Sequence, residues 1–445
     1  MTGEPPPLGL GTLSRLPASA RPLVDPADLE VGVLHLGLGV FHRAHQVVYT
    51  EEAMAVTGDR RWGICAAGMR SRATVDAVAA QDGLFSVLVR DGDPAGAPVT
   101  VELRVYGALR ETRFGAEVIE RVADPRIKVV TITVTEKGYL PGQDTIAWLV
   151  AGLERRSATG GGPLTVLSCD NMPHNGQVVR DAVLASAGHL RDWIDANVAF
   201  PSSMVDRLVP TPRPEDLAEV AAALGVSDRA AVATEPFRQW VIEDRFAAER
   251  PAWEKAGALI VPDVAPYELM KLRLLNGSHS LIAYLGMLHG CETIAETVAR
   301  DDVAQAVRAL MDQDITPTLP VPEGFDVEAY KRQLLQRFAN PALRHQTAKV
   351  AADGSLKLPL RLVTVMRERL AAGATPSYAA LGIAAWMRWV SVAPTLDDPI
   401  APALTSAAAT ARYPGGLVAA LLPLIATDLP PAAAELVTEQ LATLW

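Results

Sequence analysis

Up to about residue 264 the chain alternates apolar runs with amphipathic segments, and beyond that point helical periodicity dominates. Apolar runs at residues 31–36, 61–67, 127–135 and 164–169 are typical of strands buried on both faces of a parallel sheet. Because segments with helical spacing separate these runs, the pattern predicts an α/β domain. The Leu- and Ala-rich segments from about residue 265 onward predict a mostly α-helical C-terminal domain.

A glycine turn follows the first predicted strand and precedes a predicted helix. Gly37 and Gly39 permit a tight bend, and the amides that open a helix favour a pyrophosphate. His42 stands where the usual fingerprint has a third glycine, which predicts a wider helix–sheet spacing or a different phosphate path. Arg43 offers direct charge to the phosphates, and Phe41 belongs to the same turn. These five residues are the predicted cofactor-binding element of a Rossmann-type domain.

These signals divide the chain into three parts. Residues 1–30 form an extended lead-in, 31–264 the NAD(P)-binding domain, and 265–445 the helical substrate domain. The acidic residue that usually binds the cofactor ribose is not evident after the second strand, where Arg70 and Arg72 stand instead. These arginines fit a 2′-phosphate or a solvated surface, so NAD is the expected cofactor and NADP is not excluded.

The segment at residues 266–286 reads as a helix that carries polar groups among apolar ones. It is rich in Leu, Met, Lys and Arg, and it begins beside a proline. At 100° per residue, His279 lies roughly 80° and Asn276 roughly 140° around the helix from Lys271. Polar side chains on such a face require partners, and a substrate is one candidate. A solvent-facing stripe is the alternative.

Composition and charge narrow the class of protein. With 49% hydrophobic and 21% charged residues, the 445-residue chain is an ordinary globular one. Its formal net charge of −10 favours neither nucleic acid nor an anionic membrane as partner. Three distant cysteines argue against a disulfide framework and for a cytoplasmic protein. We expect no metal site and no membrane span, and the oligomeric state stays open.

Four motifs carry a family resemblance. They are Gly37-Leu-Gly-Val-Phe-His-Arg-Ala-His45, Thr133-Val-Thr-Glu-Lys-Gly-Tyr139, Ser168-Cys-Asp-Asn-Met-Pro-His-Asn-Gly176 and Lys271-Leu-Arg-Leu-Leu-Asn-Gly-Ser-His279. Together they resemble the polyol-specific long-chain dehydrogenases, the family of mannitol 2-dehydrogenase and fructuronate reductase. The spacing of Lys, Asn and His in the last motif is the most specific feature. With matching segments at 234–244 and 340–359, the resemblance covers about residues 31–370.

The resemblance implies metal-independent hydride transfer between NAD(P) and a secondary alcohol or ketone. By position, Lys271 resembles the general base, with Asn276 and His279 beside it. Asn171 resembles the asparagine that joins Asn276 in holding the substrate oxygen. A base role requires that burial lower the pKa of Lys271 well below the ordinary lysine value near 10.4.

Three further residues resemble substrate contacts of the family: Asp206, Lys349 and Lys357. Lys349 stands where the mannitol enzymes have arginine, so the grip on the far end of the substrate departs from their pattern. Arg344 and Arg361 add to the basic residues there, and a hexuronate carboxylate would suit such a cluster.

The sequence therefore predicts a dehydrogenase for a sugar acid or polyol, with D-mannonate and D-fructuronate as the first expectation. A mannitol 2-dehydrogenase, acting on mannitol and fructose, is the main alternative. A hydroxyacid or 6-phosphogluconate dehydrogenase joins the same kinds of domain, and a non-catalytic dinucleotide-binding sensor is the remote alternative. A sensor would not need the full set of lysine, asparagines and histidine.

Overall fold

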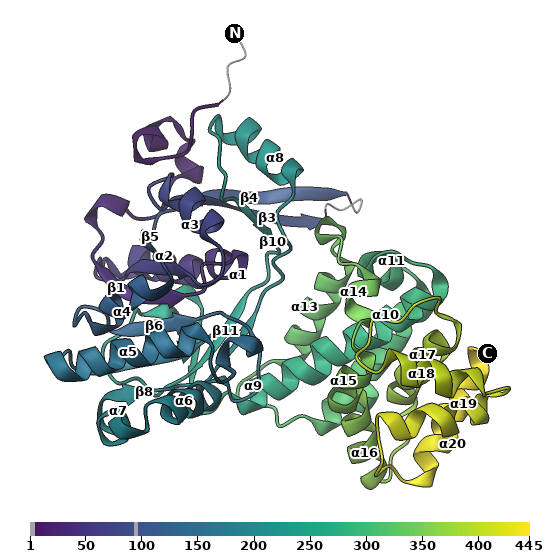
Figure 1. The fold of residues 1–445 in the computed structure, drawn as a ribbon. Coiled ribbons are helices and arrows are strands. Elements are labelled where there is room, and N and C mark those ends of the chain that lie inside the picture. Colours follow the sequence, from purple (N-terminus) through teal and green to yellow (C-terminus); the bar gives the residue numbers. More distant parts are fainter. Residues whose placement is uncertain (1–4, 93–96) are drawn as a thin grey trace. The chain divides into compact units, whose positions relative to one another are not determined.

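The protein was analysed as a computed structural model that describes residues 5–92 and 97–445. The chain forms two compact units. Unit 1 comprises Met1–Asp91 and Val99–Ala265, and unit 2 comprises Gly92–Pro98 and Pro266–Trp445. Most of unit 1 is coloured purple to teal in Figure 1, and most of unit 2 green to yellow.

Unit 1 is built on a six-stranded parallel sheet with the order β5-β2-β1-β6-β7-β8. Its strands are β1 (Val31–Leu36), β2 (Gly63–Gly68), β5 (Leu109–Phe114), β6 (Val129–Ile132), β7 (Leu164–Ser168) and β8 (Val198–Ala199). The four predicted buried strands correspond to β1, β2, β6 and β7, which confirms the α/β prediction. Because β2 and β6 flank β1 on opposite sides, the chain reverses direction across the sheet at β1. Open parallel sheets bind ligands beside the carboxyl ends of strands at such a switch point.

Successive side chains of these strands enter separate cores on the two faces of the sheet. Leu34 and Val130 pack in the core that α4 and α5 cover. Val33 enters a second core with residues of α2 and α3, and Val129 lies in a third core beside Trp253. The helices of unit 1 are α1 (Val40–Ala44), α2 (Gln46–Thr57), α3 (Arg72–Ala79), α4 (Val118–Ala123), α5 (Asp144–Thr159), α6 (Asn175–Ser186), α7 (Arg191–Asn197) and α8 (Pro214–Leu224).

Two small sheets complete unit 1. One has the order β10-β3-β4, formed by β3 (Phe85–Gly92), β4 (Pro98–Tyr106) and β10 (Val232–Thr234). The other has the order β12-β11-β9, formed by β9 (Ser203–Asp206), β11 (Gln239–Glu243) and β12 (Leu259–Val261). The sequence predicted the strand pair at 85–90 and 99–107 as an addition to the main sheet. It forms a separate sheet instead, because β10 pairs with β3 in parallel.

In the part that the structure describes, the regular elements of unit 2 are helices. The exceptions are the ends of the β3–β4 hairpin and an isolated bridge. Its α-helices are α9 (Ala265–Met270), α10 (Ser278–His289), α11 (Ile294–Val298), α12 (Asp301–Ala309), α13 (Val327–Ala339), α14 (Thr347–Ala351), α15 (Gly354–Leu358), α16 (Thr364–Ala371), α17 (Ser377–Val392), α18 (Ala401–Ala409), α19 (Pro414–Leu421) and α20 (Pro431–Thr443). Within residues 5–92 and 97–445, no helix combines the length and the hydropathy that crossing a bilayer requires.

In the described part of unit 2, three segments are π-helical: Lys271–Gly277, Leu310–Ile315 and Pro359–Val363. The first lies within the helix predicted for residues 266–286. That helix exists, but it consists of α9, a π turn and α10 in succession. Helical periodicity alone does not reveal such a turn, because π-helices are rare and are specified by their surroundings.

Candidate active site

The glycine turn after β1 has a backbone that other residues would not tolerate. Gly37 has a φ of +114°, and a Cβ atom there would lie 2.0 Å from the carbonyl oxygen of Thr133. Gly39 has an ordinary φ of −107° and precedes the first turn of α1. Gly37 therefore fixes the bend itself, whereas Gly39 leaves open space where α1 begins.

The buried side chain of His35 stabilises this turn. His35 Nδ1 lies 2.8 Å from Thr131 Oγ1, and His35 Nε2 lies 3.0 Å from the Gly37 carbonyl and 2.9 Å from Thr133 Oγ1. Thr133 Oγ1 also donates to the Gly37 carbonyl at 3.0 Å. Burial lowers the pKa of His35 to about 3, so the ring is neutral at physiological pH. The turn is thus locked to both β1 and β6.

His42 explains how α1 packs without the third glycine of the usual fingerprint. Its ring stacks on that of His35, with 3.4 Å between centroids and an interplanar angle of 5°. Neither ring nitrogen of His42 has a hydrogen-bond partner in the described parts of the chain, since Gln46 donates to His45 instead. Burial lowers the pKa of His42 well below 6.5. A flat neutral ring fills the space between helix and strand.

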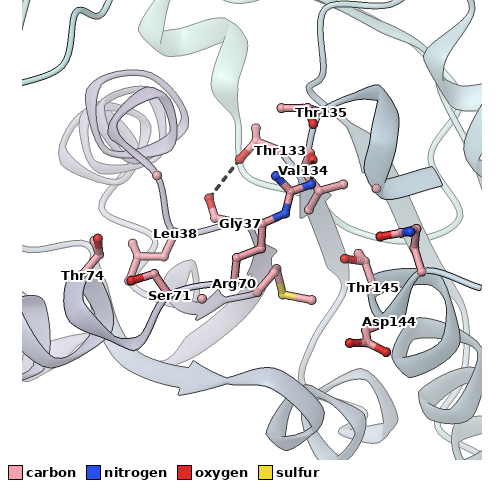
Figure 2. Close-up of a pocket in the computed structure, with 15 residues that line it drawn as sticks. Gly37, Leu38, Arg70, Ser71, Thr74, Thr133, Val134, Thr135, Asp144 and Thr145 are labelled. Atoms are coloured by element: carbon pink, nitrogen blue, oxygen red, sulfur yellow. Dashed lines mark hydrogen bonds between the residues drawn. The ribbon is translucent and has the colours of Figure 1, made fainter. Parts of the chain in front are cut away.

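A cavity of about 300 Å³ opens beside this turn (Figure 2). Its walls come from the glycine turn, the loop after β2, the end of β6 and the start of α5. The lining residues are Gly37, Leu38, Gly39, Gly68, Met69, Arg70, Ser71, Thr74, Thr133, Val134, Thr135, Gly138, Gln143, Asp144 and Thr145. The cavity lies at the carboxyl ends of β1, β2 and β6, the place where a dinucleotide binds in this architecture.

The predicted cofactor residues divide into two groups. Gly37 and Gly39 line the cavity, whereas Phe41, His42 and Arg43 do not. Arg43 is buried, and its guanidinium donates to the carbonyl of Ala230 instead of facing a phosphate. Sequence reasoning missed the hydroxyl-bearing wall at Thr133, Thr135 and Ser71. The sequence located the strand ends that carry these residues, but it did not show which of their side chains face the cavity.

The cavity wall at β6 contains a strained residue. Thr135 has a φ of +67° and a ψ of 163°, a conformation that β-branched residues rarely adopt. The Asp170 carboxylate accepts hydrogen bonds from the backbone amides of Val134 at 3.0 Å and Thr135 at 2.8 Å, and from the Tyr139 hydroxyl at 2.5 Å. These bonds tie the loop after β6 to the end of β7 and hold the strained backbone in place.

Asp170 is also the first residue of the loop that carries Asn171. Asn175 anchors this loop, because its Nδ2 donates to the carbonyls of Asp170 at 2.9 Å and Ser203 at 2.7 Å. Asn171 is exposed at the carboxyl end of β7. Asp206 is buried at the end of β9. Unit 1 therefore holds both residues at the ends of strands, on anchored backbone.

Unit 2 holds the Lys271 motif on the π turn. Lys271 opens that turn and is buried, while Asn276 is half-buried within it. A π-helix bonds residue i to residue i+5, so the five-residue separation of Lys271 and Asn276 matches one turn. The angle around the helix axis between these two side chains is therefore smaller than an α-helix would give. His279, in the first turn of α10, completes the predicted set.

His279 lies in an aromatic and cationic environment. Its ring centroid is 4.7 Å from that of Phe338 and 5.2 Å from that of His345. Burial lowers the pKa of His279 well below 6.5, and interactions with His345, Arg337 and Arg361 lower it further. A neutral imidazole here donates a hydrogen bond at one ring nitrogen and accepts one at the other, as an orienting group requires.

Two predicted substrate lysines differ in their surroundings. Lys349 is exposed on α14, and its charge, after burial and Arg337, contributes to lowering the pKa of His345. Lys357 is half-buried and donates to the Ala352 carbonyl at 2.5 Å and the Val350 carbonyl at 3.4 Å. Burial lowers the pKa of Lys357. Lys357 thus closes the end of α14, and its Nζ also lies 3.8 Å from the Asp353 carboxylate.

The predicted set therefore divides between the units. Unit 1 carries the glycine turn, Asn171 and Asp206, and unit 2 carries the Lys271 motif with the two lysines. Within residues 5–92 and 97–445, no three His, Cys, Asp or Glu side chains gather as metal ligands. The arrangement offers a dinucleotide cavity, two asparagines, a buried lysine and a cationic cluster.

Known proteins share both halves of this arrangement. Residues 31–255 match the model of the mannitol dehydrogenase Rossmann domain, and residues 263–443 match the mannitol dehydrogenase C-terminal domain. The D-mannonate oxidoreductase of Escherichia coli (strain K12) is 43% identical over 411 residues, which are 84% of this chain and 83% of the relative. These matches confirm the family resemblance seen in the sequence.

Two solved structures agree over nearly the whole chain. One is the Pseudomonas fluorescens mannitol 2-dehydrogenase in a ternary complex with NAD and D-mannitol, with a TM-score of 0.81 and 34% identity over 98% of this chain and 96% of that one. The other is a D-sorbitol dehydrogenase in substrate-free form, with a TM-score of 0.86 and 28% identity over 97% of each chain. They confirm the predicted Rossmann-type domain followed by a helical domain.

Proposed function

Because this chain belongs to the mannitol dehydrogenase family, we propose that it transfers hydride between NAD and a secondary alcohol of a linear hexonate. The proposed pair of substrates is D-mannonate and D-fructuronate. The relative at 43% identity carries the name D-mannonate oxidoreductase, which supports a sugar acid. The coarser statement, an oxidoreductase of this family, does not depend on the choice of substrate.

The observation that carries the choice of a sugar acid is the charge around His279 and His345. Burial lowers the pKa of His345, and the positive charges of Arg337 and Lys349 lower it further, while the His345 ring lies 5.2 Å from that of His279. Such a cluster stabilises a carboxylate, and guanidinium groups can bind one through two parallel hydrogen bonds. A neutral polyol would gain nothing comparable from this charge.

The cavity of unit 1 fits the adenosine diphosphate half of the cofactor. Gly37 and Gly39 line the cavity beside the start of α1, and the amides that open a helix favour a pyrophosphate. Ser71, Thr74 and Thr135 offer hydroxyls for the sugar. NAD supplies the hydride acceptor, or in its reduced form the donor.

The proton is proposed to move through Lys271. In the oxidative direction its neutral Nζ accepts the substrate hydroxyl proton while hydride leaves the same carbon, and the C–O bond becomes a carbonyl. Asn276 and Asn171 are proposed to donate amide N–H bonds to the developing alkoxide, as an oxyanion hole does. His279 orients the lysine or the substrate. In the reductive direction the Lys271 ammonium returns the proton.

A mannitol 2-dehydrogenase is the second candidate, because the solved mannitol 2-dehydrogenase covers nearly the whole chain at 34% identity. The two candidates differ in one chemical group, since fructuronate carries a carboxylate where fructose carries a hydroxymethyl group. That group makes them easy to separate by kinetics.

The test is a spectrophotometric screen of NADH and NADPH with fructuronate, tagaturonate, fructose and xylulose. We expect fructuronate with NADH to give the highest kcat/KM, by about 100-fold or more over fructose, the effect of one well-placed charged contact. Fructose turning over best would replace the sugar acid with the mannitol assignment. If none of the four ketones oxidises either cofactor, the dehydrogenase proposal fails.

A further inference from the structure

The π turn at Lys271–Gly277 requires support from outside its own backbone. π-helices are rare, appear mostly as single turns and occur often at functional sites. Strained or uncommon backbone persists only where the surrounding structure stabilises it. The contacts of this turn therefore show which residues keep Lys271 and Asn276 in their π spacing.

Two side-chain donors meet at the carbonyl oxygen of Asn276. Arg361 Nη1 donates to it at 3.3 Å, and Ser280 Oγ donates to it at 3.1 Å from one turn later. Arg361 Nη1 also donates to Ser280 Oγ at 3.2 Å, which links the two donors. A side-chain donor that bonds to a backbone carbonyl of a helix alters the helix's hydrogen bonds and bends it. A serine hydroxyl that donates to the carbonyl four residues earlier has the same effect.

Arg361 belongs to a second π segment, Pro359–Val363, which packs against the first. A Cβ at Gly277 would lie 3.4 Å from the Arg361 carbonyl oxygen, 3.5 Å from Ile315 Cδ1 and 3.6 Å from Leu362 Cδ2. Ile315 ends the third π segment, Leu310–Ile315. All three π segments of unit 2 therefore meet around Gly277, directly after Asn276.

The charge of Arg361 has no acidic counterpart in the described chain. Arg361 donates to the Asn276 carbonyl and the Ser280 hydroxyl, and across residues 5–92 and 97–445 no carboxylate forms an ion pair with it. Burial lowers its pKa to about 10. Burying a guanidinium costs solvation free energy, and no ion pair offsets that cost at Arg361. Its burial is therefore explained by the hydrogen bonds that it makes.

We propose that Arg361 is a positioning residue that holds the π turn Lys271–Gly277 and thereby aligns Asn276 with Lys271 and His279. It acts by bonding the Asn276 backbone through Nη1, which leaves Nη2 and Nε for other partners. The catalytic half of this proposal rests on the proposed function, whereas the structural half does not. Arg361 is therefore expected to affect turnover with every substrate, charged or neutral.

The test compares Arg361→Met, which removes the donors and the charge, with Arg361→Lys, which keeps the charge and one donor group. Arg367→Met is the matched control, since Arg367 lies in the same unit but pairs with Asp428. Hydrogen exchange of the peptide 271–281 and steady-state kinetics with fructuronate and fructose are measured for each protein.

We expect Arg361→Met to speed exchange in peptide 271–281 about tenfold, without a change across the rest of unit 2. We expect kcat to fall about 100-fold with both substrates, because small misplacements of reacting groups have effects of this size. Arg361→Lys should recover part of both losses, and Arg367→Met should match the wild type.

Two results would overturn the proposal. If only the KM for fructuronate rises while kcat and exchange stay unchanged, Arg361 is a substrate ligand and not a positioning residue. If exchange rises throughout unit 2, Arg361 serves folding alone. Should Arg361→Met fail to fold, Arg361→Lys decides, since wild-type exchange and kcat in that variant refute the proposal. If the wild type turns over none of the ketones, the proposed function fails, and the exchange measurement still tests the turn.

Discussion

The glycine turn of unit 1 and the π turn of unit 2 position functional groups in opposite ways. At Gly37 the constraint lies in the residue itself, since only glycine adopts a φ of +114° with a carbonyl 2.0 Å from the missing Cβ. At Lys271–Gly277 no residue adopts a positive φ. The π geometry there coincides with contacts from Arg361 and from two other π segments.

This difference explains why the glycine turn could be predicted from the sequence, whereas the π turn could be predicted only as part of a helix. A glycine motif between a strand and a helix carries a local backbone signal. A π turn has no such signal, because its side chains fit an α-helix equally well. Substitutions of residues that act through their own backbone, and of residues that act through contacts with distant segments, test this difference.

The largest effect is expected at Lys271. Lys271→Met should lower kcat for alcohol oxidation by about 10³-fold, within the range of lost general-base catalysis. The alkaline rise of the pH profile should also disappear. Steady-state rates between pH 6 and 10 measure both. Lys331→Met is the control, because Lys331 is a buried lysine of the same unit that pairs with Asp312 and Glu328. A normal profile in Lys271→Met would remove the base assignment.

Gly37→Ala should be the next most damaging change. The added methyl meets the Thr133 carbonyl and imposes a strained φ, so we expect a loss of about 3 kcal/mol in unfolding free energy. NADH affinity, measured by fluorescence titration, should fall at the same time. Gly39→Ala is the matched control for stability, since its nearest neighbour would be 3.7 Å away. Equal stability of the two variants would show that Gly37 does not fix the bend.

His42→Phe tests the packing that replaces the third glycine. Because burial lowers the pKa of His42 well below 6.5, the folded protein keeps it neutral while the unfolded chain binds a proton below about pH 6.5. The unfolding free energy should therefore fall by up to roughly 2 kcal/mol between pH 7 and pH 5 on account of this group. Phenylalanine preserves the stacking surface and removes that loss.

Urea unfolding of both proteins at pH 5 and pH 7 measures the difference. His35 and His45, whose pKa values burial lowers to about 3, act in the same direction in both proteins. Glu51, whose pKa burial raises to about 7, acts in the opposite direction in both. An unchanged pH dependence in His42→Phe would mean that His42 does not contribute.

The smallest effect is expected at Arg70. Its guanidinium lines the cavity and donates to the Val134 carbonyl at 3.4 Å, so it bridges two walls (Figure 2). Arg70→Ala should raise the KM for NADH about threefold to tenfold, the value of one hydrogen bond to a charged group. A larger rise for NADPH would indicate contact with the 2′-phosphate. Arg72→Ala is the control, since Arg72 lies over Phe114, outside the lining.

Several details of the candidate site could not be predicted from sequence, for physical reasons. The glycine turn and the strand ends were located, because apolar runs and glycines are local signals. The inward turn of Arg43 toward Ala230 was not, since that carbonyl lies far away in sequence. The strained Thr135 was not predicted either, because its support comes from Asp170, in the loop after β7. Distant backbone partners decide both.

The four central strands of the main sheet, the helical character of the second domain, the family and the residue types of the candidate site follow from the sequence alone. Hydrophobic periodicity and fixed motif spacing act along the chain, so they can be read without a fold. Only the tertiary structure decided that Lys271 and Asn276 lie one π turn apart. That spacing coincides with contacts between segments far apart in the sequence, such as the bond from Arg361 to the carbonyl of Asn276, 85 residues away.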